Sequence, residues 1–198
     1  VKISGMTDHQ LAQFDDQIDF VLFFENEQDA NASLLDVHIL DRLRDHPQVT
    51  RDKLLAMAAH NGRARGIATG DLCDLDHAAL FGRMVEEELL KVMVVISGQG
   101  PRAFGMPEMF TPMRHINANR SLHRLAALIS DGRYSGTTWG AAIGHVTPEA
   151  MAGGWIGLLQ TGDLLHVQLT ERRIVLIDPQ AFADTQPPGS AVQPWDID

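Results

Sequence analysis

The stretch Val92-Met93-Val94-Val95-Ile96-Ser97-Gly98-Gln99-Gly100 carries the strongest structural signal in the chain. Its apolar run is rich in β-branched residues and too short for a helix of its own, which is typical of a buried strand that ends in a loop. A second unit of this kind runs from residue 123 to 129 and continues into Ser130-Asp131-Gly132. On a shared sheet, two such strands place both turns at one rim, where function most often resides.

Upstream of this pair, the sequence predicts two further strands and three helices. Residues 1–3 and 20–24 are short apolar segments bounded by Gly, Asp and Asn, which favours strands. Apolar residues at helical spacing predict an amphipathic helix over residues 28–43. A second helix is expected from the capping residue Thr50 to a stop at Asn61-Gly62, and a third from Asp74 or Asp76 to residue 90. Residues 28–90 are therefore predicted to be mostly helical.

Downstream of the pair, the sequence predicts a short helix followed by strands. Thr147-Pro148-Glu149 offers a cap with proline at the first helical position, and Gly153-Gly154 offers a stop. Three apolar segments, residues 155–159, 164–169 and 173–177, alternate with turn residues and predict an antiparallel run. Residues 181–198 are rich in proline and aspartate and are expected to form an extended tail.

The composition of the chain limits the classes of protein to which it can belong. The chain has 198 residues, of which 44% are hydrophobic and 21% charged, as in an ordinary globular domain. No apolar run reaches the roughly 18 residues of a membrane span, and a net charge of −10 argues against nucleic-acid binding. A single cysteine, Cys73, allows no internal disulfide and, without an export signal, indicates the cytoplasm. Because the sequence starts at Val1, we expect a fragment or a processed product.

Positive charge is concentrated in one stretch of this acidic chain. Residues 100–135 hold five arginines against two acids, a local charge of +3. This segment could attract an anionic small molecule. It could equally be a solvated face with scattered ion pairs, and charge alone does not decide between the two.

Three segments rich in glycine and polar residues follow the two buried strands, and the second of them is the most unusual. They are Gly105-Met106-Pro107-Glu108-Met109, Ser130-Asp131-Gly132-Arg133-Tyr134-Ser135-Gly136-Thr137-Thr138-Trp139-Gly140, and Gly144-His145-Val146-Thr147-Pro148-Glu149-Ala150. Small and hydroxylated residues crowd around Ser135, and a helix starting at Gly136 would stabilise negative charge there. The alternative is a simple turn with a capping hydroxyl. A hydrolase elbow is not matched, because position 133 is Arg where that motif has Gly.

In combination, the three segments resemble the dehydratases that include dihydroxy-acid, phosphogluconate and aldonate dehydratases. The likeness runs from residue 92 to about residue 177, with the segments in the order and approximate spacing of that family. The resemblance implies a two-domain enzyme, whose N-terminal domain supplies the cysteines of an iron–sulfur cluster and most ligands of a Mg²⁺ ion. It implies that residues 1–180 form the C-terminal domain, an α/β unit of the swivelling β/β/α type with a β-barrel-like mixed sheet flanked by helices.

The resemblance also implies a role for each residue that matches the family's segments. Glu108 would be a Mg²⁺ ligand, and Ser135 would be the general base that removes the C2 proton of a 2,3-dihydroxy acid. Thr137 would hydrogen-bond the substrate or the serine, and Thr138 would contact the substrate. Arg133 would either neutralise substrate charge or brace its loop through Asp131, and the sequence leaves these two alternatives equal.

Several expectations follow about the whole enzyme. One thiol cannot hold an iron–sulfur cluster, so this hydro-lyase fragment is expected to be inactive without its N-terminal domain. Residues 36–90 look like a helical insertion, and a homo-oligomer is expected. Residues 140–167, and the segment Gly136-Thr137-Thr138-Trp139-Gly140, resemble the aldonate dehydratases more than the branched-chain enzyme, which implies a sugar acid as the substrate. Two alternatives stay open: a non-catalytic organic-acid-binding module, and a separate small subunit that pairs with a cysteine-bearing large one.

Overall fold

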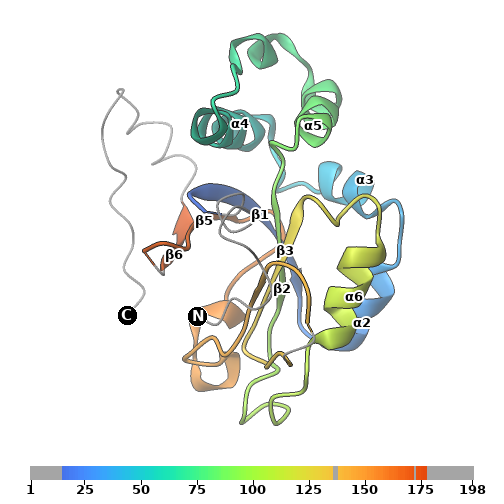
Figure 1. Cartoon of the computed structure of the whole chain (residues 1–198), viewed down its shortest axis with the longest axis vertical. Coiled ribbons are helices and arrows are strands. Elements are labelled where there is room, and N and C mark those ends of the chain that lie inside the picture. The colour runs from blue at the N-terminus through green and yellow to red at the C-terminus, as the bar shows by residue number, and fades with distance from the viewer. Residues whose placement is uncertain (1–14, 136–137, 172, 178–198) are drawn as a thin grey trace.

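The computed structural model describes residues 15–135, 138–171 and 173–177, and its centre is a curled six-stranded sheet (Figure 1). The strand order is β4-β3-β2-β1-β5-β6. The strands are β1 (Gln17–Phe24), β2 (Val92–Ile96), β3 (Ala126–Ser130), β4 (Ala142–Ile143), β5 (Leu164–Gln168) and β6 (Arg173–Ile177). Strands β1 to β4 pair in parallel, whereas β5 pairs antiparallel with both β1 and β6. The predicted mixed α/β fold, with a curled sheet flanked by helices, is confirmed.

Alternate residues of the central strands enter two separate cores. Val94 and Leu128 belong to the larger core, on the face covered by α2 (Glu27–Leu34) and α6 (Phe110–Ala118). Their neighbours Val95 and Ile129 belong to the second core, which contains Ile156 of the short 3₁₀ helix η3 (Trp155–Gly157). Both faces of β2 and β3 are therefore buried, which explains why these strands are almost continuously apolar. Each fully buried side chain of this size contributes roughly 1.5–3 kcal/mol.

The predicted helix over residues 28–43 is wrong as a single element. The structure breaks it into α2 and α3 (Ile39–Arg44). The side-chain amide of Asn119 donates to the carbonyls of Leu34 (2.9 Å) and Asp36 (3.0 Å), and so satisfies acceptors where α2 ends. The helical spacing of residues 28–43 could not reveal this contact, because Asn119 is more than 80 residues away in the sequence. Val37, which the helical pattern turned inward, is exposed.

The predicted start of the second helix is confirmed, but its predicted stop is wrong. Thr50 caps α4 (Arg51–Arg65), which passes through Asn61-Gly62 and ends at Gly66, a glycine in the left-handed conformation at φ 67°. Asn61 is a buried bridge: its side chain accepts from the Ile18 N–H (2.8 Å) and donates to the carbonyls of Ile18 and Leu89 (2.9 Å each). An amide that satisfies three backbone groups outside its own helix stabilises the helix interior instead of ending it.

The remaining helices follow the sequence prediction only in part. Asp76 caps α5 (His77–Glu86), which ends four residues before the predicted residue 90, and a short 3₁₀ helix η1 (Gly70–Asp74) precedes it. Residues 36–90 are thus mostly helical as predicted, and that they form an insertion stays a prediction. Helix α6 was not predicted. In the part of the chain that the structure describes, no helix is long and apolar enough to cross a membrane.

The region after residue 147 differs from the prediction in two places. The short helix η2 (Ala150–Ala152) begins at Ala150 and not at Pro148, and the Thr147-Pro148 peptide bond that precedes it is cis. Residues 155–157 form the 3₁₀ helix η3 instead of a strand. The antiparallel part of the sheet still has three strands, because β5 pairs antiparallel with β1 on one side and with β6 on the other. Residues 1–3 and 181–198 lie outside the described residues.

Replacing the bridging amide tests this account of α4. We expect Asn61→Ala to lower the free energy of unfolding by about 2–4 kcal/mol, because three buried backbone groups lose their partner. Urea denaturation of both proteins measures the change. Asn117→Ala is the matched control, since its exposed amide makes one hydrogen bond, to the Trp139 carbonyl. Equal losses in the two variants would contradict the bridging role.

Candidate functional site

The two central parallel strands end side by side, and the loops that follow them form a common rim. Ile96 of β2 is paired with Ser130 of β3, so Ser97 and Asp131 begin neighbouring loops. In Figure 1 these loops extend from the end of the sheet that is opposite α4 and α5. The shared rim predicted from the sequence is confirmed.

A short parallel bridge joins the first glycine-containing segment to the second. Glu108 pairs with Arg133: the Met109 N–H donates to the Arg133 carbonyl (2.8 Å), and the Arg133 N–H donates to the Pro107 carbonyl (3.2 Å). The Glu108 side chain is one third exposed, and its Oε2 lies 3.7 Å from Arg133 Nη1. This ion pair is longer than a hydrogen bond, so the carboxylate can turn to another cation.

Arg133 also braces its loop, but not through the predicted partner. Its Nε donates to the Met106 carbonyl at 2.9 Å, which reinforces the backbone bridge. Asp131 is 1% exposed, and its carboxylate accepts from the N–H groups of Gln99 (2.8 Å) and Ala150 (3.0 Å). The alternative in which Arg133 acts through Asp131 is therefore wrong: Asp131 holds two other loops by their backbone.

A second buried carboxylate ties the third segment to the loop after β2. Both oxygens of Glu149 lie 3.0 Å from the donating N–H of Arg102, and Glu149 is buried. Gly100 permits this approach, because a Cβ there would lie 1.9 Å from Glu149 Oε2. The sequence placed Asp131 and Glu149 inside the notable segments but gave no sign that they act as clamps between loops.

The third segment also packs closely on the second. The His145 N–H donates to the Gly132 carbonyl at 2.9 Å. A Cβ at Gly144 would lie 2.5 Å from the ring of Tyr134, so only glycine allows this packing. Burial raises the pKa of Tyr134, which keeps its phenol neutral. All three segments thus meet at one rim.

Ser135 lies two residues beyond the Glu108–Arg133 bridge and is half-buried at this rim. Its carbonyl accepts from the Thr138 N–H at 3.3 Å, which closes a turn. Thr138 and Trp139 are not helical, so the described residues give no support to a helix dipole beside Ser135. Thr137 lies outside the described residues.

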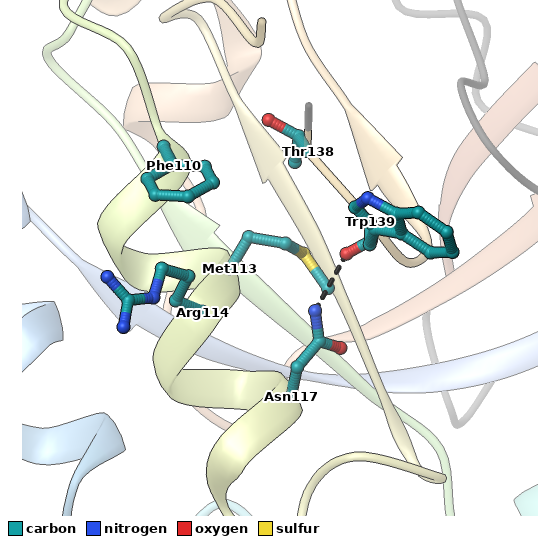
Figure 2. A pocket seen from close by; sticks show the side chains of 6 residues that line it. All are labelled: Phe110, Met113, Arg114, Asn117, Thr138 and Trp139. Carbon is teal, nitrogen blue, oxygen red and sulfur yellow. Dashed lines mark hydrogen bonds between the residues drawn. The ribbon is translucent and has the colours of Figure 1, made fainter. Parts of the chain in front are cut away.

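A pocket of about 300 Å³ opens next to this turn (Figure 2). Thr138 is 2% exposed, and its hydroxyl has no hydrogen-bond partner among the described residues. Across from it, the Asn117 amide of α6 donates to the Trp139 carbonyl at 2.8 Å. The lining residues are Phe110, Met113, Arg114, Asn117, Thr138 and Trp139. The lining is mostly apolar, and the unpaired, buried Thr138 hydroxyl is the candidate hydrogen-bonding group for a ligand.

The arginines of residues 100–135 do not form one basic patch. Arg102 and Arg133 follow β2 and β3 at the rim, whereas Arg120 and Arg124 precede β3 at the opposite end of the sheet. Arg124 pairs with Glu88 at 3.0 Å, and Arg114 lies over the ring of Phe110. Of the two interpretations of this segment, scattered charge contacts describe it better.

The cofactors implied by the sequence resemblance fit this chain unequally. Glu108 offers an accessible carboxylate oxygen at the rim, which suits one ligand position of Mg²⁺. Cys73 lies in η1, between α4 and α5 and away from the rim (Figure 1). One thiol cannot hold an iron–sulfur cluster, so such a cluster does not fit this chain.

Comparison with known proteins identifies the family. The model of the family described as dihydroxy-acid/6-phosphogluconate dehydratase C-terminal matches residues 53–188, and the chain belongs to this family. The dihydroxy-acid dehydratase of Halothermothrix orenii is 42% identical over 120 residues, which are 60% of this chain and 20% of that protein. The enzyme of the same name from Maridesulfovibrio salexigens is 54% identical over 82 residues, 41% of this chain and 15% of that protein. A third, from Desulfatibacillum aliphaticivorans, is 40% identical over 125 residues, 63% of this chain and 21% of that protein. The aligned residues make up about a fifth of these relatives.

The clamp at Asp131 generates a testable expectation. Asp131→Asn leaves one of two backbone N–H groups without an acceptor, so we expect faster hydrogen exchange at the Gln99 or the Ala150 amide, whichever loses its acceptor. The free energy of unfolding should fall by about 1–3 kcal/mol. Asp71→Asn is the control, because Asp71 is exposed and lies 3.9 Å from Arg83. Unchanged exchange at both amides would show that Asp131 does not hold these loops.

Proposed function

We propose that this chain is the C-terminal part of a hydro-lyase that removes water from a 2,3-dihydroxy acid to give a 2-keto acid. The observation that carries the proposal is the Glu108–Arg133 bridge, which sets a carboxylate and the loop of Ser135 at one rim. Membership of the dehydratase family supports it. A non-catalytic module that binds organic acids is a weaker alternative, because the loosely paired carboxylate of Glu108 would repel an acid at this rim.

Glu108 is proposed as one protein ligand of Mg²⁺. Its carboxylate is a hard oxygen donor, and its only ion-pair partner among the described residues is Arg133 at 3.7 Å. When bound, Mg²⁺ and the iron–sulfur cluster of the complete enzyme supply the positive charge that stabilises the substrate carboxylate and the departing C3 hydroxyl. Arg133 is half exposed beside Glu108 and is proposed to attract the anionic substrate.

Ser135 is proposed as the general base. Its hydroxyl oxygen, as the alkoxide, takes the proton from C2 while the C3 hydroxyl leaves, and the resulting enol tautomerises to the 2-keto acid. A serine hydroxyl is normally far too weak an acid for this role, so the positive charge near the rim has to lower its pKa. Thr137 and Thr138 are proposed to orient the substrate, and the unpaired Thr138 hydroxyl supports that role for Thr138.

The three relatives carry the name dihydroxy-acid dehydratase, and on this basis the first candidate that we propose as substrate is a dihydroxy acid of the branched-chain type. A sugar acid is the second candidate. Asn117, Thr138 and the exposed Trp139 gather around the pocket beside the turn, and such groups suit a polyhydroxylated chain. The sequence preference for a sugar acid therefore remains a proposal.

The complete enzyme is proposed to be larger than this chain. An N-terminal part would hold the cluster and most Mg²⁺ ligands, and this domain would close over it. A cysteine-bearing large subunit is the alternative. A homo-oligomer, a cytoplasmic location and an insertion at residues 36–90 belong to the same proposal.

Activity of the complete enzyme tests these roles. We expect Ser135→Ala to lower kcat at least about 100-fold with little change in KM, because proton removal is lost and binding is kept. Glu108→Gln should raise the Mg²⁺ concentration for half-maximal activity roughly tenfold or more. The assay measures 2-keto acid formation from a branched-chain dihydroxy acid and from an aldonate, which separates the two substrates.

The controls are Ser121→Ala and Glu86→Gln, which change the same residue types away from the rim. Both should keep full activity, and the 198-residue chain by itself should have none. Wild-type turnover by Ser135→Ala, or turnover of aldonates by the isolated chain, would refute the proposed mechanism.

A further inference from the structure

Two histidines and an aspartate come together at the N-terminal end of β1. This end of the strand is remote from the rim that is formed by the loops after β2 and β3. Asp16 immediately precedes β1, His60 lies on α4 and His166 on β5. One ligand atom from each residue lies within 4.8 Å of the others. Asp16 Oδ1 is 2.8 Å from His166 Nε2 and 3.5 Å from His60 Nε2, so one carboxylate oxygen faces both rings.

The surrounding contacts fix the three side chains in place. The preceding residue, Asp15, accepts from the Leu169 N–H at 2.6 Å and so holds this segment against the end of β5. His60 Nε2 also lies 3.0 Å from the Asp16 carbonyl oxygen, a contact that a bound ion would replace. The two imidazole rings meet edge to face with centroids 4.9 Å apart. Three elements distant in sequence therefore converge on one point.

Exposure divides the cluster into an inner and an outer side. The histidine side chains are 16% and 19% exposed, whereas the Asp16 side chain is 62% exposed. The rings are thus partly shielded, and the carboxylate borders water. A metal ion could enter from this side and keep a water molecule as a further ligand.

We propose that Asp16, His60 and His166 form a binding site for a divalent transition-metal ion, with Zn²⁺ as the best match. Two imidazole nitrogens and one carboxylate oxygen are a common protein ligand set for Zn²⁺, with a fourth position left to water. At metal–ligand distances of about 2.0–2.1 Å, tetrahedral ligand atoms stand about 3.3 Å apart. The separations of 2.8 and 3.5 Å, and the upper limit of 4.8 Å for the set, differ from this value by at most about 1.5 Å.

The site is independent of the proposed dehydratase chemistry. It uses none of the rim residues, and it lies where α4, β1 and β5 meet (Figure 1). Its nitrogen donors distinguish it from the oxygen site proposed at Glu108, because imidazole suits Zn²⁺ and carboxylate suits Mg²⁺. A bound ion would join these three elements, so its effect is expected on stability.

Titration of chelator-treated protein with Zn²⁺ tests the site. We expect one high-affinity ion per chain, with a dissociation constant on the order of 1 μM or lower, and a melting temperature that rises with Zn²⁺. His60→Gln and His166→Gln should each weaken binding at least about 100-fold. His38→Gln is the matched control, since His38 forms an exposed pair with Asp41 at 3.2 Å, and it should bind like the wild type.

The visible spectrum of the Co²⁺-loaded wild-type protein gives a second readout that requires no variant to fold. Intense bands typical of four-coordination support the site, and the weak bands of a six-coordinate ion contradict it. Binding weaker than about 100 μM in the wild type overturns the proposal. Equal affinity in the wild type and in folded His60→Gln and His166→Gln does the same, because any ion bound would then be elsewhere.

Discussion

The parallel pairing of β2 with β3 is the constraint on which the rest of the structure depends. Both strands are buried on both faces, so neither can shift its register without moving apolar side chains between two separate cores. This fixed register ends the strands at the same level, with Ile96 beside Ser130. The loops that carry the polar segments therefore begin side by side, although more than 30 residues separate them in the chain.

The loops hold that arrangement through backbone contacts and two buried carboxylates. Asp131 and Glu149 accept only from backbone N–H groups in the described contacts, so they connect loops without a matching positive charge. Glycines at positions 100 and 144 permit approaches that a Cβ would block. A rigid rim of this kind can keep Glu108 and Ser135 in fixed positions even though neither belongs to a regular element.

Much of the fold could be predicted from local sequence because the decisive signals were local. The apolar run of β2, the caps Thr50 and Asp76 and the turns before β5 and β6 each act over a few residues. The errors arose where a distant partner decided the outcome. Asn119 ends α2 from 85 residues away, and Asn61 extends α4 by bonding to β1 and to Leu89. Helix α6 was missed although it covers the sheet.

The candidate site was predictable in its location but not in its contacts. Two strands that end in polar turns indicated a shared rim, and the structure confirms it. The clamps at Asp131 and Glu149 depend on pairings between loops, which no spacing in the sequence reveals. The cluster of Asp16, His60 and His166 was equally hidden, because its members are separated by 44 and 106 residues and lie on three different elements.

The most direct test of the rim is a cross-link between its two main segments. Bridge partners on adjacent strands lie about 5 Å apart, within the range that a disulfide spans. In a Cys73→Ser background, Glu108→Cys combined with Arg133→Cys should form an intramolecular disulfide under mild oxidation, seen as the loss of two hydrogens by mass spectrometry and of both titratable thiols. The two single variants control for links between molecules. Two thiols that stay free in the folded double variant would contradict the account, because Glu108 and the Ser135 loop would then not share one rim.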